Sequence, residues 1–314
     1  ALYGATTQRA LLNFPISDLR FNRTFIKSIA EIKRCAAETN LELGTLEKNI
    51  ADEIIKAAEL VSKGDYDSEF VVDIFQTGSG TSTNMNTNEV ISNVAIKNMG
   101  GIIGSRDPIH PNDHVNKGQS SNDVVPTAIH IAGCVGIVES LIPGLEKLQK
   151  SLEKKSEEFW GIIKTGRTHL QDATPIRLGQ EFLGYSGQIE ESIRRAKNSL
   201  GELSVLALGG TAVGTGIGMQ KGFSNKVIEK LSKRFNIKFS ESPNHFHSQS
   251  TIDAIVASSG NLKTIAVSLM KIGNDIRWLG SGPRAGIGEI ELPEVQPCSS
   301  IMPGKVNPVI SESL

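Results

Sequence analysis

The stretch Asn261–Gly280, NLKTIAVSLMKIGNDIRWLG, carries apolar side chains at helical spacing along its whole length. They recur at steps of three and four positions, and they are Leu262, Ile265, Leu269, Ile272, Ile276 and Leu279. Such spacing gathers the apolar side chains on one face of a helix, and that face packs against other helices. Because the stripe runs through the whole stretch, it predicts one long helix of a helical bundle.

Two more stretches carry a long apolar stripe. The first is EFLGYSGQIEESIRRAKNSLGEL, residues 181–203, and its striped positions are Phe182, Ile189, Ile193, Ala196, Leu200 and Leu203. The second starts at NDVVPTAIHIA, residues 122–132, and ends at the charged EKKSEEF, residues 153–159. Pro143 lies inside it and is expected to bend or split the helix, because proline removes a backbone hydrogen bond.

The rest of the chain also has mainly helical patterns. Further helices are predicted by shorter amphipathic stretches at residues 23–40, 46–64 and 222–236. We find no sustained β-alternation, no βαβ rhythm and no internal repeat. The expected fold is therefore mainly α. Its expected parts are an N-terminal, mainly helical domain over residues 1–119 and a central long-helix bundle domain over residues 120–314.

The composition is that of an ordinary soluble globular protein. Of 314 residues, 39% are hydrophobic and 21% are charged, and the formal net charge is −1. This balance lacks the basic surplus typical of proteins that bind nucleic acids or anionic membranes. No apolar run approaches the roughly 18–20 residues of a membrane span, and no signal peptide is visible. Cys35, Cys134 and Cys298 lie far apart without a CxxC pair, which favours a reducing compartment.

Four segments interrupt the helical patterns with hydroxyl, amide and glycine residues. They are QTGSGTSTNMNTNEV at residues 76–90, NKGQSSNDVVPTAIHIA at 116–132, KTGRTHLQDATPIRLGQEF at 164–182 and QPCSSIMPGKVNP at 296–308. Helix caps are the commonest use of such residues, with proline in the first turn, as at Pro126 and Pro175. Each segment, however, holds more polar groups than one cap needs. Helix N-termini attract anions, so these segments together with Lys305 predict a site for a small dicarboxylate.

Several other kinds of site do not fit the sequence. GSGT at residues 78–81 lacks the third glycine of a dinucleotide fingerprint, and GKV at 304–306 lacks the Ser/Thr of a P-loop. His245 and His247 are too close for a helical metal pair and have no nearby acidic or cysteine partner, so we do not expect a metal site. His169 lies in a polar loop and its pKa range suits proton transfer, although a structural role is equally compatible with the sequence alone.

The four segments, in this order, resemble the fumarase/aspartase superfamily. SSIMPGKVNP resembles its signature, and GSGTSTNMNTNEVI, HPNDHVNKGQSSNDVVPTAIHIA, GRTHLQDATPIRLGQEF, GGTAVGTG and SLMKIGNDIRWLGSGPRAGIGEIELPE resemble further family motifs. Within the superfamily, KGQSSND and RWLGSGPRAGIGEI look most like class II fumarases. TSTNMN points toward aspartases, and GRTHLQDA is compatible with both.

The resemblance implies roles for individual residues. It implies that Ser299 is the base that removes a proton, and that His169, paired with Glu312, is placed at the substrate and its water. Substrate contacts are implied for Ser79, Thr81, Ser120, Ser121, Asn122, Thr168, Lys305 and Asn307. The HPND motif implies a second carboxylate site at His110, Asn112 and Asp113. Thr211, in GGTAVGTG, is interpreted as shaping a turn.

The resemblance also implies a fold, an assembly and a reaction. The family fold is a homotetramer around a bundle of long helices, with active sites shared between subunits. Family members are longer than this chain, so the C-terminal part of the family fold is expected to be missing here. The implied reaction is the reversible hydration of fumarate to L-malate without a cofactor, in the cytoplasm or the mitochondrial matrix. Aspartate ammonia-lyase activity and a non-catalytic structural role, as in eye lens, are the alternatives.

Overall fold

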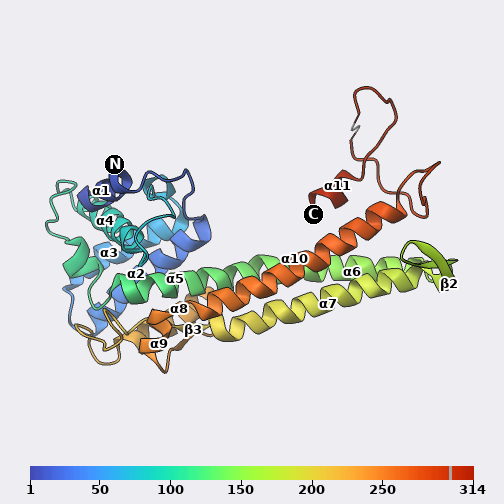
Figure 1. Cartoon of the computed structure of the whole chain (residues 1–314). Coiled ribbons are helices and arrows are strands. Elements are labelled where there is room, and N and C mark those ends of the chain that lie inside the picture. Colours follow the sequence, from blue (N-terminus) through green and yellow to red (C-terminus); the bar gives the residue numbers. More distant parts are fainter. Residues whose placement is uncertain (297–298) are drawn as a thin grey trace. The chain divides into compact units, whose positions relative to one another are not determined.

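The computed structural model describes residues 1–296 and 299–314. The chain forms two compact units, which are described separately. Unit 1 holds Ala1–Glu139 and Leu200–Val256, and unit 2 holds Ser140–Ser199 and Ala257–Leu314. Both are mainly helical (Figure 1), which confirms the predicted fold class. The division at residues 119 and 120 stays a prediction.

Unit 1 is a cluster of helices of moderate length. Its helices are α1 (Ala5–Asn13), α2 (Arg23–Glu42), α3 (Lys48–Lys63), α4 (Thr81–Asn98), α5 (Ser121–Gly136), α8 (Phe223–Phe235) and α9 (His245–Ser250). A 3₁₀ turn, η1 (Asp67–Glu69), and a π turn, η2 (Pro111–Val115), lie between them. Two short parallel strands, β3 (Val205–Leu206) and β4 (Ser240–Glu241), complete the unit. The helices predicted at residues 23–40, 46–64 and 222–236 correspond to α2, α3 and α8.

Helix α2 is the centre of unit 1 and packs against α3, α5 and α8. It starts at Asn22, whose side chain accepts a hydrogen bond from the Phe25 N–H and so satisfies a free donor of the first turn. Ile29, Ile32 and Ala36 on its inner face are fully buried. Most of the stability of such a helix comes from this packing rather than from helix propensity.

The carboxylate of Glu89 joins the N-terminus of the chain to α4. It accepts hydrogen bonds from the backbone N–H groups of Gly4, Thr6 and Thr7 at 2.9–3.0 Å, and from the Thr7 hydroxyl at 2.6 Å. These N–H groups belong to the first turn of α1 and have no partner within the helix. Glu89 therefore acts as an anionic cap supplied by another helix.

Unit 2 is built on three long helices. They are α6 (Ile142–Glu158), α7 (Leu178–Leu203) and α10 (Asp253–Leu279), with the short α11 (Val309–Ser313) near the end of the chain. Between them they bury Leu145, Leu152, Phe182, Ile189, Ile193, Ala196, Ile265, Ile272 and Leu279. Most of these residues belong to the predicted stripes, which confirms the three long helices. The last residues of α7 and the first of α10 belong to unit 1.

The helix predicted to contain Pro143 changes to a π turn just before that proline and then continues. Helix α5 ends at Gly136, a π turn, η3 (Ile137–Leu141), follows, and α6 begins with Pro143 in its first turn. Proline lacks the N–H that an α-helix needs there, and the wider π turn accommodates this loss. Pro126, by contrast, lies inside α5 rather than in its first turn.

A β-hairpin that the sequence did not predict precedes α7. Strand β1 (Ile163–Thr168) pairs antiparallel with β2 (Gln171–Arg177), and the register pairs Thr168 with Gln171. Thr174 and Pro175 therefore lie in β2 and do not start the helix, which begins at Leu178. The expectation of a helix start at these two residues was wrong because their capping pattern also suits a short exposed strand.

The continuous helical stretch Ser121–Glu158 has an 18-residue window with a mean hydropathy of 1.7. By length and composition alone it could cross a membrane, and 39% of the window is buried within the chain. No single apolar run in this stretch is long enough to span a membrane, because polar residues divide it, so the sequence predicted no span. Core helices of soluble proteins pass the same test, so the finding does not by itself indicate a membrane protein.

We predict that Glu89→Gln lowers the free energy of unfolding by about 1–2 kcal/mol at pH 7, because it weakens charge-assisted hydrogen bonds to a buried carboxylate. Burial raises the pKa of Glu89, but the hydrogen bonds from Thr7 and Thr6 outweigh it and hold the pKa below its usual range. The contribution is thus complete above about pH 4.3 and is lost as the pH falls through the lowered folded-state value. Urea unfolding at several pH values measures it.

The matched control is Glu229→Gln on the exposed face of α8, which should change the unfolding free energy little. A Glu89→Gln protein as stable as the wild type at pH 7 would contradict the capping role of Glu89.

Candidate active site

The predicted segment around Ser120 forms the start of α5. The Ser120 hydroxyl accepts a hydrogen bond from the Asn122 N–H at 3.3 Å, and the Ser120 N–H donates to Asp123 Oδ1 at 2.9 Å. This reciprocal arrangement is a capping box, so the capping interpretation holds for Ser120. Ser121 and Asn122 are not needed for the cap. The side chain of Asn122 is exposed and donates to the Ala212 carbonyl at 2.8 Å.

Asp123 connects this helix start to the turn in GGTAVGTG. Its Oδ2 accepts hydrogen bonds from the N–H groups of Gly209 and Thr211 at 3.1 and 3.0 Å. Burial raises the pKa of Asp123, and the N–H groups around the carboxylate oppose that shift. Thr211 is buried and has a φ of +53°, which agrees with its interpretation as a turn-shaping residue.

The predicted segments at the starts of α4 and α5 lie together in unit 1. Asn84 Nδ2 donates to the Ser121 hydroxyl at 3.0 Å. Gly80 has a φ of +69°, and a Cβ at this position would lie 2.7 Å from a methyl carbon of Val125. Only glycine allows this close approach of the two helix starts. The hydroxyls of Ser79 and Thr81 are 2.8 Å apart at the same end of α4.

The HPND motif forms the π turn η2. The Nδ1 atom of His110 accepts hydrogen bonds from the N–H groups of Asn112 and Asp113 at 3.3 and 3.2 Å, and it lies 3.3 Å from Asp113 Oδ2. The side chains of Asn112 and Asp113 are exposed. Since Nδ1 is occupied by the turn, His110 has only its Nε2 atom left for a ligand.

Thr168 and His169 lie at the tip of the hairpin in unit 2. His169 and Leu170 form its two-residue loop and have φ values of +55° and +59°. Positive φ at two non-glycine residues is sterically costly, and such strain clusters at functional sites. The turn exposes the imidazole of His169, so the hairpin presents this side chain outward.

Ion pairs hold the hairpin against the segment after α10. Glu289 lies 2.6 Å from Arg167 and 2.5 Å from Lys164, and Lys164 also lies 2.8 Å from Glu181 on α7. Burial raises the pKa of Glu289, but its bonds to Arg167 and Lys164 outweigh burial and lower the pKa below its usual range. The cluster is largely shielded from water, which strengthens its electrostatic interactions.

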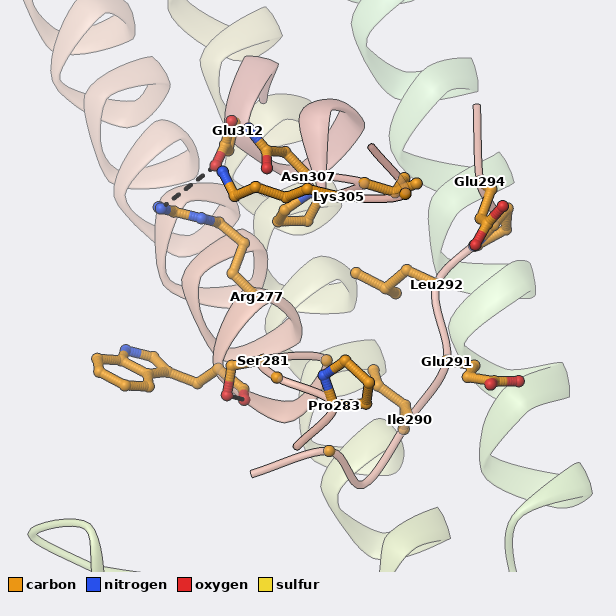
Figure 2. A pocket seen from close by; sticks show the side chains of 18 of the residues that line it. Arg277, Ser281, Pro283, Ile290, Glu291, Leu292, Glu294, Lys305, Asn307 and Glu312 are labelled. Atoms are coloured by element: carbon orange, nitrogen blue, oxygen red, sulfur yellow. Dashed lines mark hydrogen bonds and ion pairs between the residues drawn. The ribbon is translucent and has the colours of Figure 1, made fainter. Parts of the chain in front are cut away.

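The signature segment lies near a cavity of about 750 Å³ in unit 2. Figure 2 shows Lys305, Asn307 and Glu312 grouped on one side of it, with Arg277 reaching toward Glu312 from α10. Ser299 accepts a hydrogen bond from the Met302 N–H at 3.0 Å. Cys298 lies outside the described residues.

Glu312 pairs with Arg277, at 3.6 Å, and not with His169. Among the described residues, no hydrogen bond or ion pair joins Glu312 to His169. The resemblance implies sites shared between subunits, so their pairing stays a prediction about the assembly. The described residues likewise contain no group of three His, Cys, Asp or Glu side chains placed to hold a metal ion.

Some residues around the site were not found from the sequence. Lys33 on α2 is fully buried beside the start of α5, and Arg277 and Glu289 hold predicted site segments. A lysine on the apolar face of an amphipathic helix is an available signal for Lys33. For Arg277 and Glu289 the sequence carries no such signal, because each pairs with residues that are distant along the chain.

Comparison with known proteins places the chain in a family. A family model described as lyase matches residues 1–314. A class II fumarate hydratase of Rickettsia bellii is 53% identical over 99% of this chain and 67% of its own length, and the mitochondrial fumarate hydratase of Homo sapiens is 52% identical over 99% and 61%. The crystal structure of the class II fumarase of Schistosoma mansoni superposes with a TM-score of 0.96, at 41% identity over 99% of this chain and 69% of that one.

The chain thus has the fold and the motifs of a lyase. It belongs to the lyase family, within the class II fumarate hydratases, and spans about two thirds of the length of these relatives or slightly less. The expected resemblance and the expected shortening relative to the family are both confirmed.

We predict that Glu289→Gln loosens the hairpin that carries His169. Removing the carboxylate charge leaves the ammonium of Lys164 and the guanidinium of Arg167 without their shared partner, so the strained turn loses support. Amide hydrogen exchange at residues 163–177 should speed up about tenfold, the effect of roughly 1.4 kcal/mol. Glu191→Gln, in an exposed pair on α7, serves as the control. Equal exchange in both variants would refute the anchoring role.

Proposed function

We propose that the protein catalyses the reversible hydration of fumarate to L-malate. The observation that carries this proposal is the identity of more than half of the residues with class II fumarate hydratases over nearly the whole chain. The same relatives favour fumarate hydration over the aspartate ammonia-lyase alternative, which TSTNMN had left open. Retention of Ser299, His169, Lys305 and Glu312 also argues against a purely structural role.

In the proposed reaction, Ser299 removes a proton from the carbon next to a carboxylate of L-malate. The hydroxyl on the neighbouring carbon then leaves with a proton as water, and fumarate forms. His169, with Glu312 as its partner in the assembly, is proposed to hold that water and to supply the proton. The negative charge that develops on the carboxylate needs fixed donors, for which Lys305 and Asn307 are proposed.

The other predicted residues are proposed to bind the rest of the substrate. Unit 1 contributes Ser79, Thr81, Ser120, Ser121 and Asn122, and unit 2 contributes Thr168. His110, Asn112 and Asp113 are proposed as the second carboxylate site. These three residues lie on an exposed turn with one ring nitrogen of His110 free, which is compatible with a weak anion site.

The proposed assembly is a homotetramer whose active sites are shared between subunits. Helix α10 exposes Val267 and Met270, which lie about one helical turn apart, to 60 and 65%. Exposed large apolar side chains of this kind favour a partner surface. Packing long helices of several subunits together would bury them. Because relatives include bacterial and mitochondrial proteins, the proposed compartment is the cytoplasm or the mitochondrial matrix.

The test of the function uses the full-length protein and the ultraviolet absorbance of the fumarate double bond. A rise with L-malate and none with L-aspartate is expected. A rise with L-aspartate alone would establish an ammonia-lyase. No rise with either substrate would contradict both enzymatic assignments.

We predict that Ser299→Ala lowers kcat by about 10²–10⁴-fold, the usual contribution of a positioned proton-transfer group. The neighbouring Ser300→Ala is the matched control and should keep turnover within a few-fold, because Ser300 has no assigned role in the reaction. If both variants turned over malate as fast as the wild type, the base would have to be sought elsewhere.

A further inference from the structure

Lys33 is a lysine in the core of unit 1. Its side chain is 0% exposed on the face of α2 that also buries Ile29, Ile32 and Ala36. A lysine is almost never fully buried unless its amine is hydrogen-bonded, because its desolvation costs free energy. Here Nζ donates to Asn116 Oδ1 at 2.8 Å and to Gln119 Oε1 at 3.0 Å.

Lys33 holds the turn that leads into the serine segment. Asn116 Nδ2 donates onward to the Gln119 carbonyl at 3.2 Å, and Gln119 Nε2 donates to the carbonyls of Val115 and Lys117, both at 3.2 Å. In both side-chain amides, those of Asn116 and Gln119, the oxygen thus accepts a hydrogen bond from Lys33 and the nitrogen donates to backbone carbonyls. Ser120 and Ser121 follow directly in the chain.

The amine of Lys33 sets the direction of this network. Lysine donates hydrogen bonds and, when charged, accepts none, so both amides must turn their oxygens toward it. Burial lowers the pKa of Lys33 to about 7, and the carboxylate of Asp123 opposes this shift. Charged or neutral, the amine carries at least two N–H groups, so the two bonds persist in either state.

The orientation of the Asn116 amide determines the orientation of the Asn84 amide, which contacts Ser121. Asn84 Nδ2 donates one hydrogen to Asn116 Oδ1 at 3.2 Å and the other to the Ser121 hydroxyl oxygen at 3.0 Å. Turning the Asn84 amide over would put its oxygen against Asn116 Oδ1, an acceptor facing an acceptor. The amide keeps this orientation although Asn84 Oδ1 is buried with no hydrogen-bond partner among the described residues.

The consequence is a preferred orientation for the Ser121 hydroxyl, whose hydrogen points away from Asn84. Its oxygen already accepts from Asn84, so its hydrogen remains to be donated elsewhere. A carboxylate can only accept hydrogen bonds, and a hydroxyl held as a donor suits it better than one free to rotate. A substrate group that can only donate, such as an ammonium, would leave this hydrogen without an acceptor.

We propose that Lys33 and Asn84 are positioning residues that fix the Ser121 hydroxyl as a hydrogen-bond donor to a substrate carboxylate. This inference rests on the proposed function. It attributes the preference of Ser121 for a carboxylate to the buried hydrogen-bond network of Lys33 and the amides next to it. Neither residue touches the substrate. Both act through Ser121.

Lys33→Met tests whether Lys33 orients the side-chain amides. Methionine is similar in length and unbranched, but it donates no hydrogen bond. The contact of Ser121 with a carboxylate exists in the ground state and the transition state alike, so its loss weakens binding uniformly. KM for fumarate and for L-malate should rise about tenfold, with kcat within about threefold. Lys33→Arg, which keeps a donor-only group, should restore part of the lost affinity.

Asn84→Asp tests the relay without changing volume. An aspartate at this position offers only acceptors to Ser121, so the Ser121 hydrogen turns inward and is lost to the substrate. KM should rise at least as much as in Lys33→Met. If Lys33→Met fails to fold, this variant carries the test, and an unchanged KM in a folded Asn84→Asp protein would overturn the proposal.

Two controls separate positioning from stability and from the function itself. Ile32→Val on α2 lowers the melting temperature by removing a buried methyl group, and its KM should stay unchanged. If the wild-type protein does not convert L-malate, the proposed function fails. If the wild type is active and Lys33→Met keeps the wild-type KM, only the present inference fails.

Discussion

The carboxylate of Asp123 is the interaction on which the rest of unit 1 depends. One oxygen caps α5 through Ser120, and the other receives two N–H groups of a turn 86 and 88 residues further along the chain. A buried carboxylate is stable only when such donors surround it. Because it fixes both the helix start and the Gly209–Thr211 turn, the serine segment has a defined position before any substrate arrives.

Asp123 and Lys33 are two buried ionisable groups, and each affects the pKa of the other. Each shifts the pKa of the other toward the charged form, while burial shifts both toward neutrality. Asp123 only accepts hydrogen bonds, from the N–H groups of Ser120, Gly209 and Thr211, while Lys33 donates to Asn116 and Gln119. Satisfied polar contacts of this kind orient the backbone and amides around them, which an apolar core cannot do.

The sequence predicted the long helices well because their apolar residues repeat at helical spacing over many turns, as in Asn261–Gly280. It could not predict the β1–β2 hairpin, since β2 is short, exposed and contains Pro175, and its turn is His169–Leu170 rather than an Asn-Gly pair. The site residues could be named from motifs, but the approach of α4 to α5 depends on long-range contacts such as Gly80 to Val125. The role of Lys33 depends on which amide atoms face it, and no pattern of residue types carries that information.

The predicted site residues of unit 1 and those of unit 2 reach their local geometry by different physical means. In unit 1, the side-chain amides that accept from buried Lys33 and the buried carboxylate of Asp123 orient neutral hydroxyls. In unit 2, a strained two-residue turn presents His169, and Lys164, Arg167 and Glu289 balance the strain with an ion-pair cluster. Neutral donors suit binding, because they hold a carboxylate without a large desolvation cost. An exposed imidazole suits proton transfer, because a partner group and the substrate can both reach it.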